Sequence, residues 1–140
     1  MENEIILLDT DFLIEYLYNN SGAITAVNKN TSAFFVVGFT TIAEIVKGSL
    51  NKEQQQKLSK HIKAFHVLHI DEEISEMALQ LILDYHLGYN AAVNDCLLAA
   101  TALKYNCQLA TCNTKHFAYI PKLQLLQHNV TPQRTGFVGL

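Results

Sequence analysis

The chain alternates short, continuous apolar runs with longer segments in which apolar residues recur at helical spacing. Each apolar run stops at polar or glycine positions, which is typical of a strand covered on both faces of a parallel sheet. The predicted strands are residues 4–8, 33–37, 65–70 and 108–110, with 123–126 as a candidate fifth strand.

Between these runs, the apolar spacing of three and four residues predicts amphipathic helices. The predicted helices are residues 12–18, 23–30, 41–50, 52–63, 72–86 and 91–105. Polar residues that favour helix starts, and a glycine that favours a helix end, mark the expected boundaries. The expected start-capping residues are Thr10 or Asp11, Thr40 or Thr41, Asp71 and Asn90, and the expected end residue is Gly88.

This order of elements predicts an α/β protein with a three-layer α/β/α architecture and a central, mostly parallel sheet of four or five strands. We expect one domain over residues 1–128. Residues 129–140 carry a proline and two glycines, and we expect them to form a C-terminal loop or mobile tail.

The composition is that of a globular protein, with 49% hydrophobic and 16% charged residues among 140. No apolar run reaches membrane-spanning length, and the three cysteines form no C-x-x-C pair, so we expect a cytoplasmic protein with unpaired thiols. The net charge of −3 and the single arginine argue against a broad nucleic-acid surface. A small acidic site that reaches phosphates through a bound divalent metal remains compatible with this charge.

The apolar stretch 94–103 carries one acid, Asp95, on its apolar face. Burying an ion costs several kcal/mol, whereas a nearby helix N-terminus returns only about 0.3–1 kcal/mol. Asp95 therefore indicates either a nearby cation or metal-bearing cleft, or a carboxylate that caps the helix from solvent.

Two more acids, Asp9 and Glu44, lie shortly after predicted strands. Asp9 ends the first strand, where ligands bind in open parallel sheets, although a turn residue would look the same. Glu44 lies opposite the apolar stripe of its helix, which indicates a solvated residue, but it also follows a strand closely. Because parallel topology can gather Asp9, Glu44 and Asp95 at one sheet edge, and gathered carboxylates repel, a bound Mg²⁺ or Mn²⁺ is the expected relief.

Four segments in order resemble the motifs of PIN-domain nucleases, in particular the VapC-type ribonuclease toxins of toxin–antitoxin pairs. They are L-L-D-T-D-F-L-I-E-Y-L, T-T-I-A-E-I-V-K-G, N-D-C-L-L-A-A-T-A-L and L-A-T-C-N-T-K-H-F, and the match spans about residues 5–121. The resemblance implies Mg²⁺- or Mn²⁺-dependent cleavage of RNA phosphodiesters by an acidic core.

In that core Asp9 and Asp95 would bind metal directly, and Glu44 would hold a second metal or orient water. Thr10 and Thr111 would support these ligands with their hydroxyl groups, or serve simply as cap and turn residues.

The chain departs from the family pattern after the fourth strand, where a fourth acid is common. Residues 111–117 contain no acid, and Asn113 and His116 occupy the corresponding places. Asn113 could bind metal or only form a turn, and His116 could bind water on the metal or be structural. One-metal and two-metal schemes therefore both stay open.

The resemblance also implies partners: an RNA substrate, a small cognate antitoxin, and a homodimer or toxin–antitoxin hetero-oligomer. We expect the antitoxin groove near helices 12–18, 23–27 and 42–50. The candidate phosphate contacts are Lys47, Lys104, Lys115, Lys122 and Arg134. The alternative is a catalytically weak or inactive PIN-like protein that works as a protein-binding module, since the fourth acid is missing and basic residues are few.

Overall fold

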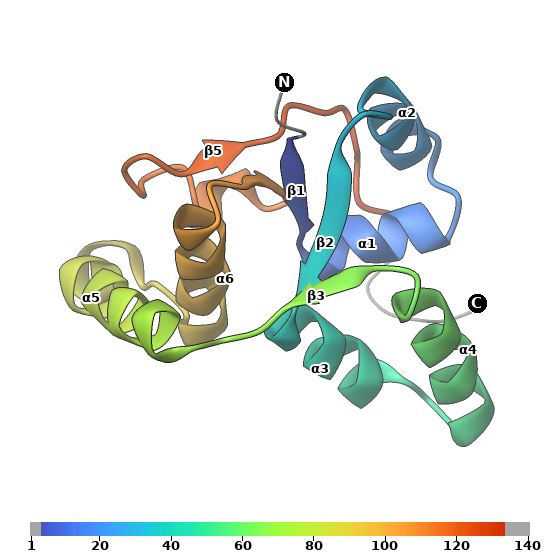
Figure 1. Cartoon of the computed structure of the whole chain (residues 1–140), viewed down its shortest axis with the longest axis horizontal. Helices are drawn as coiled ribbons and strands as arrows, with labels where there is room; N and C mark the ends of the chain where they lie inside the picture. Colours follow the sequence, from blue (N-terminus) through green and yellow to red (C-terminus); the bar gives the residue numbers. More distant parts are fainter. Residues whose placement is uncertain (1–3, 134–140) are drawn as a thin grey trace.

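A parallel sheet forms the centre of the molecule (Figure 1). The computed structural model describes residues 4–133, and within them the sheet has five strands in the order β3-β2-β1-β4-β5, with every neighbouring pair parallel. The strands are β1 Ile5–Leu8, β2 Phe34–Gly38, β3 His66–Leu68, β4 Gln108–Ala110 and β5 Gln124–Leu125. The predicted parallel sheet and its candidate fifth strand are confirmed.

Helices cover both faces of this sheet, as Figure 1 shows. They are α1 Thr10–Leu17, α2 Ser21–Lys29, α3 Phe39–Gly48, α4 Lys52–Ile62, α5 Glu72–Tyr89 and α6 Val93–Lys104. Successive side chains of a strand point to opposite faces. Leu7 therefore packs in the core beneath α5 and α6, whereas Ile6 and Leu8 pack in a second core against α1 to α4. The three-layer prediction is confirmed.

Helices α1, α2 and α3 each begin two residues earlier than the sequence predicted, and before α1 and α3 the strand runs directly into the helix. Asp9, rather than Thr10 or Asp11, caps α1, and its carboxylate accepts a hydrogen bond from the Thr10 N–H. Gly38 occupies the cap position of α3, so both predicted threonine caps lie inside that helix. The expected cap of α5 is confirmed, since Asp71 accepts from the Ile74 N–H at 2.9 Å.

The turn between α5 and α6 also differs from the prediction. Gly88 lies inside α5, which continues to Tyr89 and ends at Asn90 in the left-handed conformation, with φ of 53°. Asparagine tolerates this conformation better than most residues, so it ends α5 rather than starting α6. Ala92 takes the position before α6.

The described part of the C-terminal segment, residues 126–133, is irregular but fixed by hydrogen bonds to the rest of the fold. The Leu126 N–H donates to the Leu109 carbonyl, and the Gln133 N–H donates to the Glu15 carboxylate. Gly22 of α2 lets this segment approach, because a β-carbon there would lie 2.8 Å from the Asn129 carbonyl oxygen. The predicted boundary between a domain over residues 1–128 and a C-terminal loop or tail over residues 129–140 stays a prediction, and residues 134–140 lie outside the described residues.

Cys96 and Cys107 are buried and unpaired, as expected for core thiols. Within residues 4–133, no helix is long and apolar enough to span a membrane.

Truncation of the central strand should destabilise the protein strongly. Leu7 is 0% exposed at the middle of β1, so Leu7→Ala should lower the free energy of unfolding by about 2–5 kcal/mol through lost burial and a cavity. Leu87 on α5 is 94% exposed, so Leu87→Ala is a matched control that should change it by less than about 0.5 kcal/mol. Chemical denaturation of both variants measures the difference, and equal effects would contradict this assignment of the core.

Candidate active site

The carboxyl ends of β1 and β4 bring the first acid and its hydroxyl partner together. The Asp9 N–H donates to the Ala110 carbonyl at 2.9 Å, which fixes the residue just beyond the two strands. Its Oδ2 accepts from the Thr111 hydroxyl and its Oδ1 from the Thr10 N–H, both at 2.8 Å. Both oxygens of the carboxylate are therefore oriented by the surrounding fold.

The pKa of Asp9 is raised to about 7, mainly by burial, then by the charge of Asp11 and to a smaller extent by that of Asp95. The hydrogen bonds from Thr111 and Thr10 oppose this rise because they favour the ionised form. A carboxyl group whose pKa is this far from its usual value is typical of a functional site.

Asp95 lies in the first turn of α6 and contacts His116, which closes the short 3₁₀ helix Thr114–His116. Its Oδ2 is 3.2 Å from His116 Nδ1, and its side chain is 26% exposed. Burial raises the pKa of Asp95, while the adjacent imidazole lowers it. Asp95 is thus half-buried beside a partner of opposite charge when His116 is protonated, and it is not a cap fully exposed to solvent.

Glu44 reaches the same site from α3. The residue is exposed as a whole, as its helical position indicated. Partial burial of its carboxyl nevertheless raises its pKa, and the charges of Asp95 and Asp11 raise it further. The Thr10 hydroxyl acts in the opposite direction, although it makes no hydrogen bond of normal geometry. Glu44 therefore lies within electrostatic range of Asp95 and Asp11.

The loop after β4 contributes Thr111, which is buried, and Asn113, which is exposed. The Asn113 N–H donates to the Thr111 hydroxyl at 3.1 Å. This bond orients the hydroxyl toward Asp9, so the backbone of Asn113 supports the site whatever its side chain does.

Asp11 lies near these acids, whereas the sequence predicts it only as a possible cap of the first helix. Its carboxylate raises the pKa values of both Asp9 and Glu44. The signal that could have found it is the D-T-D spacing, because Asp11 lies two positions after Asp9, in the first turn of the helix that begins at the same edge.

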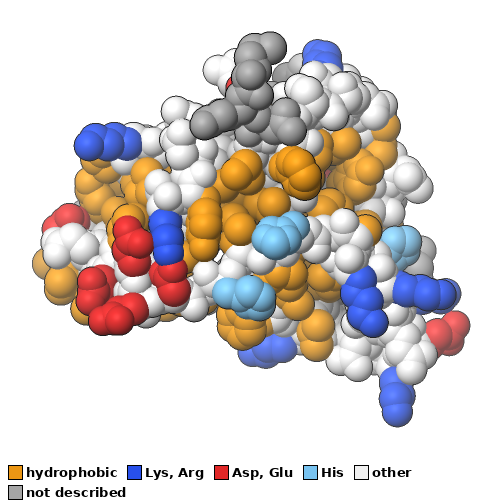
Figure 2. All heavy atoms as spheres, in the orientation of Figure 1, with side chains coloured by type: hydrophobic (Ala, Val, Ile, Leu, Met, Phe, Trp, Pro, Cys, Tyr) orange, Lys and Arg blue, Asp and Glu red, His pale blue; other side chains and the backbone are white. Residues whose placement is uncertain are grey.

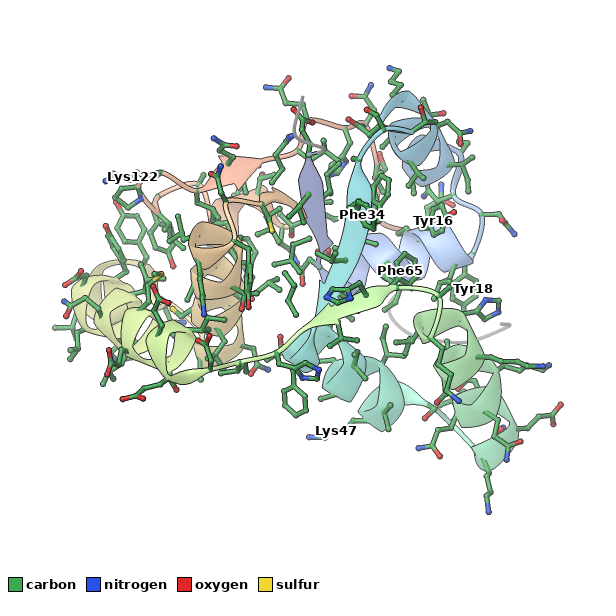
Figure 3. All side chains as sticks on the ribbon, viewed as in Figure 1. Tyr16, Tyr18, Phe34, Lys47, Phe65 and Lys122 are labelled. Atoms are coloured by element: carbon green, nitrogen blue, oxygen red, sulfur yellow. The ribbon has the colours of Figure 1, made fainter. Side chains whose placement is uncertain are left out.

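The candidate phosphate contacts do not all lie near these acids. Lys104 forms ion pairs with Asp71 and Glu73, so that lysine is not a free contact. Lys47 extends from α3, whereas Lys122 lies on the opposite side of the molecule, beyond α6 (Figure 3). Lys115, beside His116, is exposed and remains a candidate, and Arg134 lies outside the described residues.

Comparison with known proteins shows the family to which the chain belongs. A family model for the PIN domain matches residues 6–123, most of the chain. The chain belongs to the PIN-domain family.

Several proteins resemble this PIN domain over most of their length. Ribonuclease VapC10 of Mycobacterium tuberculosis is 27% identical over 125 residues, which cover 86% of this chain and 91% of that protein. The structure of VapBC-1 from nontypeable Haemophilus influenzae contains a chain that is 30% identical, with a TM-score of 0.73 and coverage of 86% and 96%. A toxin–antitoxin complex from Klebsiella pneumoniae gives 26% identity, a TM-score of 0.70 and coverage of 91% and 97%.

The donor atoms of this PIN domain suit a hard divalent cation. In the described part of the chain, no three carboxylate, imidazole or thiol groups are close enough to hold an ion between them directly. Mg²⁺ needs no such cage, because it is commonly bound through one or two carboxylates and keeps several waters. Two buried oxygens at this edge, Thr10 Oγ1 and Asp11 Oδ2, have no hydrogen-bond partner among residues 4–133, and Thr10 also donates its N–H to the carboxylate of Asp9. The site therefore fits Mg²⁺ or Mn²⁺ by its oxygen chemistry.

The raised pKa of Asp9 predicts a pH-dependent stability without divalent metal. Because the folded chain holds the Asp9 proton up to about pH 7 whereas the ordinary value is 3.8, ionisation opposes folding as pH rises between these values. Asp9→Asn removes this penalty. Relative to the parent, its free energy of unfolding should increase by roughly 1–4 kcal/mol from pH 4 to pH 8, since one pH unit of pKa displacement corresponds to about 1.36 kcal/mol.

Urea unfolding of both proteins in EDTA at several pH values measures this difference. The comparison at each pH cancels the titration of groups that the two proteins share. A stability difference that stays constant from pH 4 to pH 8 would contradict the shifted Asp9.

Proposed function

We propose that this PIN domain is a Mg²⁺- or Mn²⁺-dependent endoribonuclease that cleaves RNA phosphodiester bonds, and that it is the toxin of a type II toxin–antitoxin pair. The observation that supports the proposal is that Asp95, in the first turn of α6, lies within electrostatic range of both Asp9, at the cap of α1, and Glu44 of α3. A ribonuclease and toxin–antitoxin complexes among the similar proteins support it.

The residues of this edge suit phosphodiester hydrolysis. A divalent ion held here would acidify the attacking water and neutralise charge on the phosphate. Asp9 and Asp95 would bind it, since Thr111 and His116 hold their carboxylates in fixed orientations. Glu44, the most exposed of these acids, would orient water or hold a second ion.

The small number of lysines and arginines in the chain is compatible with an RNA substrate. With few lysines at this edge and one arginine in the sequence, the bound ion rather than a basic surface would attract the phosphate. His116, whose side chain is 59% exposed, and the adjacent Lys115 are placed to contact the RNA backbone beside Asp95.

Neutralising the acids should abolish cleavage. Asp9→Asn and Asp95→Asn should each reduce the rate of cleavage of a single-stranded RNA with Mn²⁺ by at least roughly 100-fold, because each removes a carboxylate from the ion. Asp84→Asn, an exposed acid of α5 outside the site, is the control and should cleave like the parent. EDTA should stop cleavage by the parent, and added Mn²⁺ should restore it.

Matching far-UV circular dichroism spectra of all variants would show that loss of activity is not loss of fold. Cleavage at the parental rate by both Asp9→Asn and Asp95→Asn would overturn the proposed site.

A second candidate function is a PIN-like binding module without catalysis. The absence of acids from residues 111–117 and the low basicity favour it. Calorimetry decides between the two functions, because a binding module would bind no Mn²⁺ in the millimolar range.

We further propose that the protein is cytoplasmic and that its partners are a small antitoxin and a second toxin subunit. Large apolar side chains are exposed at both ends of the α3 region, at Phe39 and Leu50, which agrees with one of the helices expected to form the groove. A stripe on α5, formed by Leu79, Leu83 and Leu87, was not anticipated. Figure 2 shows apolar side chains across much of one face, and contiguous patches of this kind commonly mark protein interfaces.

Co-expression should reveal the partner. Expression of the chain alone in a bacterial host should arrest growth, and co-expression with the neighbouring open reading frame should restore it because the antitoxin blocks the acidic site. The inactive Asp9→Asn variant should leave growth unaffected and still co-purify with that partner. Growth arrest that persists with the neighbouring protein bound would contradict the toxin–antitoxin assignment.

A further inference from the structure

Three tyrosines form an aromatic cluster between the end of α5 and the segment that follows the 3₁₀ helix. The rings of Tyr89 and Tyr119 are stacked, with centroids 4.2 Å apart and an interplanar angle of 8°. Tyr85, one turn before Tyr89 in α5, contacts the Tyr119 ring at 5.0 Å and meets the Tyr89 ring edge-on at 5.9 Å. The Tyr89 ring therefore has a fixed orientation.

Tyr89 stays accessible although its ring is held. Tyr85 and Tyr119 pack against the core that contains Leu7, whereas Tyr89 is 59% exposed. A flat aromatic ring that is already ordered loses little conformational entropy when a ligand covers it. Tyr89 thus offers a preformed surface for a planar ligand.

Both segments that carry this stack adjoin Asp95. Tyr89 ends α5, and Asp95 lies six positions later, in the first turn of α6. Tyr119 follows His116 by three positions, and His116 Nδ1 is 3.2 Å from Asp95 Oδ2. Asp95 is also within electrostatic range of the Tyr119 hydroxyl. The aromatic cluster therefore borders the acidic site.

Tyr89 does not belong to the exposed apolar stripe of α5, which consists of Leu79, Leu83 and Leu87. Residues two positions apart in a helix point about 200° away from each other, so Leu87 and Tyr89 lie on opposite sides of α5. Tyr89 instead continues the side of Tyr85, which packs toward the core. A protein partner bound to the leucine stripe would leave the Tyr89 ring accessible.

The charge around the cluster favours a neutral planar ligand. Carboxylates at this edge repel phosphates, and the chain has few basic residues to hold an RNA backbone. A nucleobase carries no such charge, and single-stranded RNA is commonly bound by stacking its bases on aromatic side chains. Stacking therefore offers substrate affinity that the surface charge of this chain does not.

We propose that Tyr89, backed by Tyr119, stacks on a base of the single-stranded RNA substrate next to the phosphate at Asp95. The inference rests on the proposed ribonuclease function. Because every base has an aromatic face, this contact positions the strand with little preference for sequence. The competing explanations are that the cluster only packs the end of α5, or that Tyr89 contacts a protein partner.

Binding of a mixed-sequence single-stranded RNA that the parent cleaves with Mn²⁺ tests the proposal. All proteins carry Asp9→Asn so that the RNA stays intact, and fluorescence anisotropy measures the dissociation constant. Tyr89→Ala should weaken binding by roughly 5- to 100-fold, because stacking of one base on an aromatic side chain contributes about 1–3 kcal/mol. Tyr89→Phe should retain binding, whereas Tyr89→Leu, which is apolar but not aromatic, should lose it.

Tyr105→Ala is the matched control and should bind like the Asp9→Asn protein. Tyr105 is 37% exposed and lies at the end of α6 away from Asp95. Circular dichroism spectra that match among the variants exclude a loss of fold, and Tyr89→Leu replaces Tyr89→Ala if the alanine variant does not fold.

Removing bases from the RNA gives an independent readout of stacking. Abasic nucleotides are placed one at a time along the strand, and each RNA is titrated into the Asp9→Asn protein with and without Tyr89→Ala. At one position the abasic RNA should bind both proteins equally, because the base and the ring are lost as a pair. An affinity loss from Tyr89→Ala that is the same at every abasic position would overturn the stacking.

The remaining outcomes separate this inference from the proposed function. Equal RNA affinity of Tyr89→Phe and Tyr89→Leu would overturn the inference alone, as would unchanged RNA affinity of Tyr89→Ala together with weaker self-association or antitoxin binding. A parent protein that neither binds nor cleaves single-stranded RNA would overturn both the inference and the proposed function.

Discussion

Burial of carboxylates near one another at one edge of the sheet is the constraint around which this site is organised. Asp9, Asp11, Glu44 and Asp95 all have raised pKa values, and burial is the largest cause for each. The fold fixes three of these four carboxylates separately. Hydrogen bonds from Thr111, Cys112 and the backbone at Thr10 hold the first two acids, and the His116 imidazole partners Asp95.

The parallel sheet makes this arrangement possible. Because all strands point the same way, the turns after β1, β2 and β4 open at one edge, and three helices start there. The core on each side of the sheet fixes these starts: Phe12 of α1 and Ile45 of α3 are buried in one core, and Leu98 of α6 is buried in the other. The packing that stabilises the domain therefore also positions its acids.

The C-terminal segment also helps to position the acidic site. His128 joins the loop after β4 to this segment through the Thr111 carbonyl and packs edge-on against Phe12, with ring centroids 5.0 Å apart. Thr111 thus contacts the acidic site through its hydroxyl and the C-terminal segment through its carbonyl. Residues that the sequence presents as a plain loop help to hold the residue that orients Asp9.

The sequence by itself determined the fold class, because continuous apolar strands and periodic helices have different spacing and length. It also identified Asp9, Glu44 and Asp95 as candidates, through their places after strands and the order of the motifs. Their roles as ligands stay predictions. Only the tertiary structure decided that Asp9 and Gly38 are the capping residues of α1 and α3. Whether a strand leads directly into a helix depends on packing rather than on local capping preference. It alone showed Asp11 at the site and Lys104 in ion pairs, because contacts between residues far apart in the chain leave no local pattern.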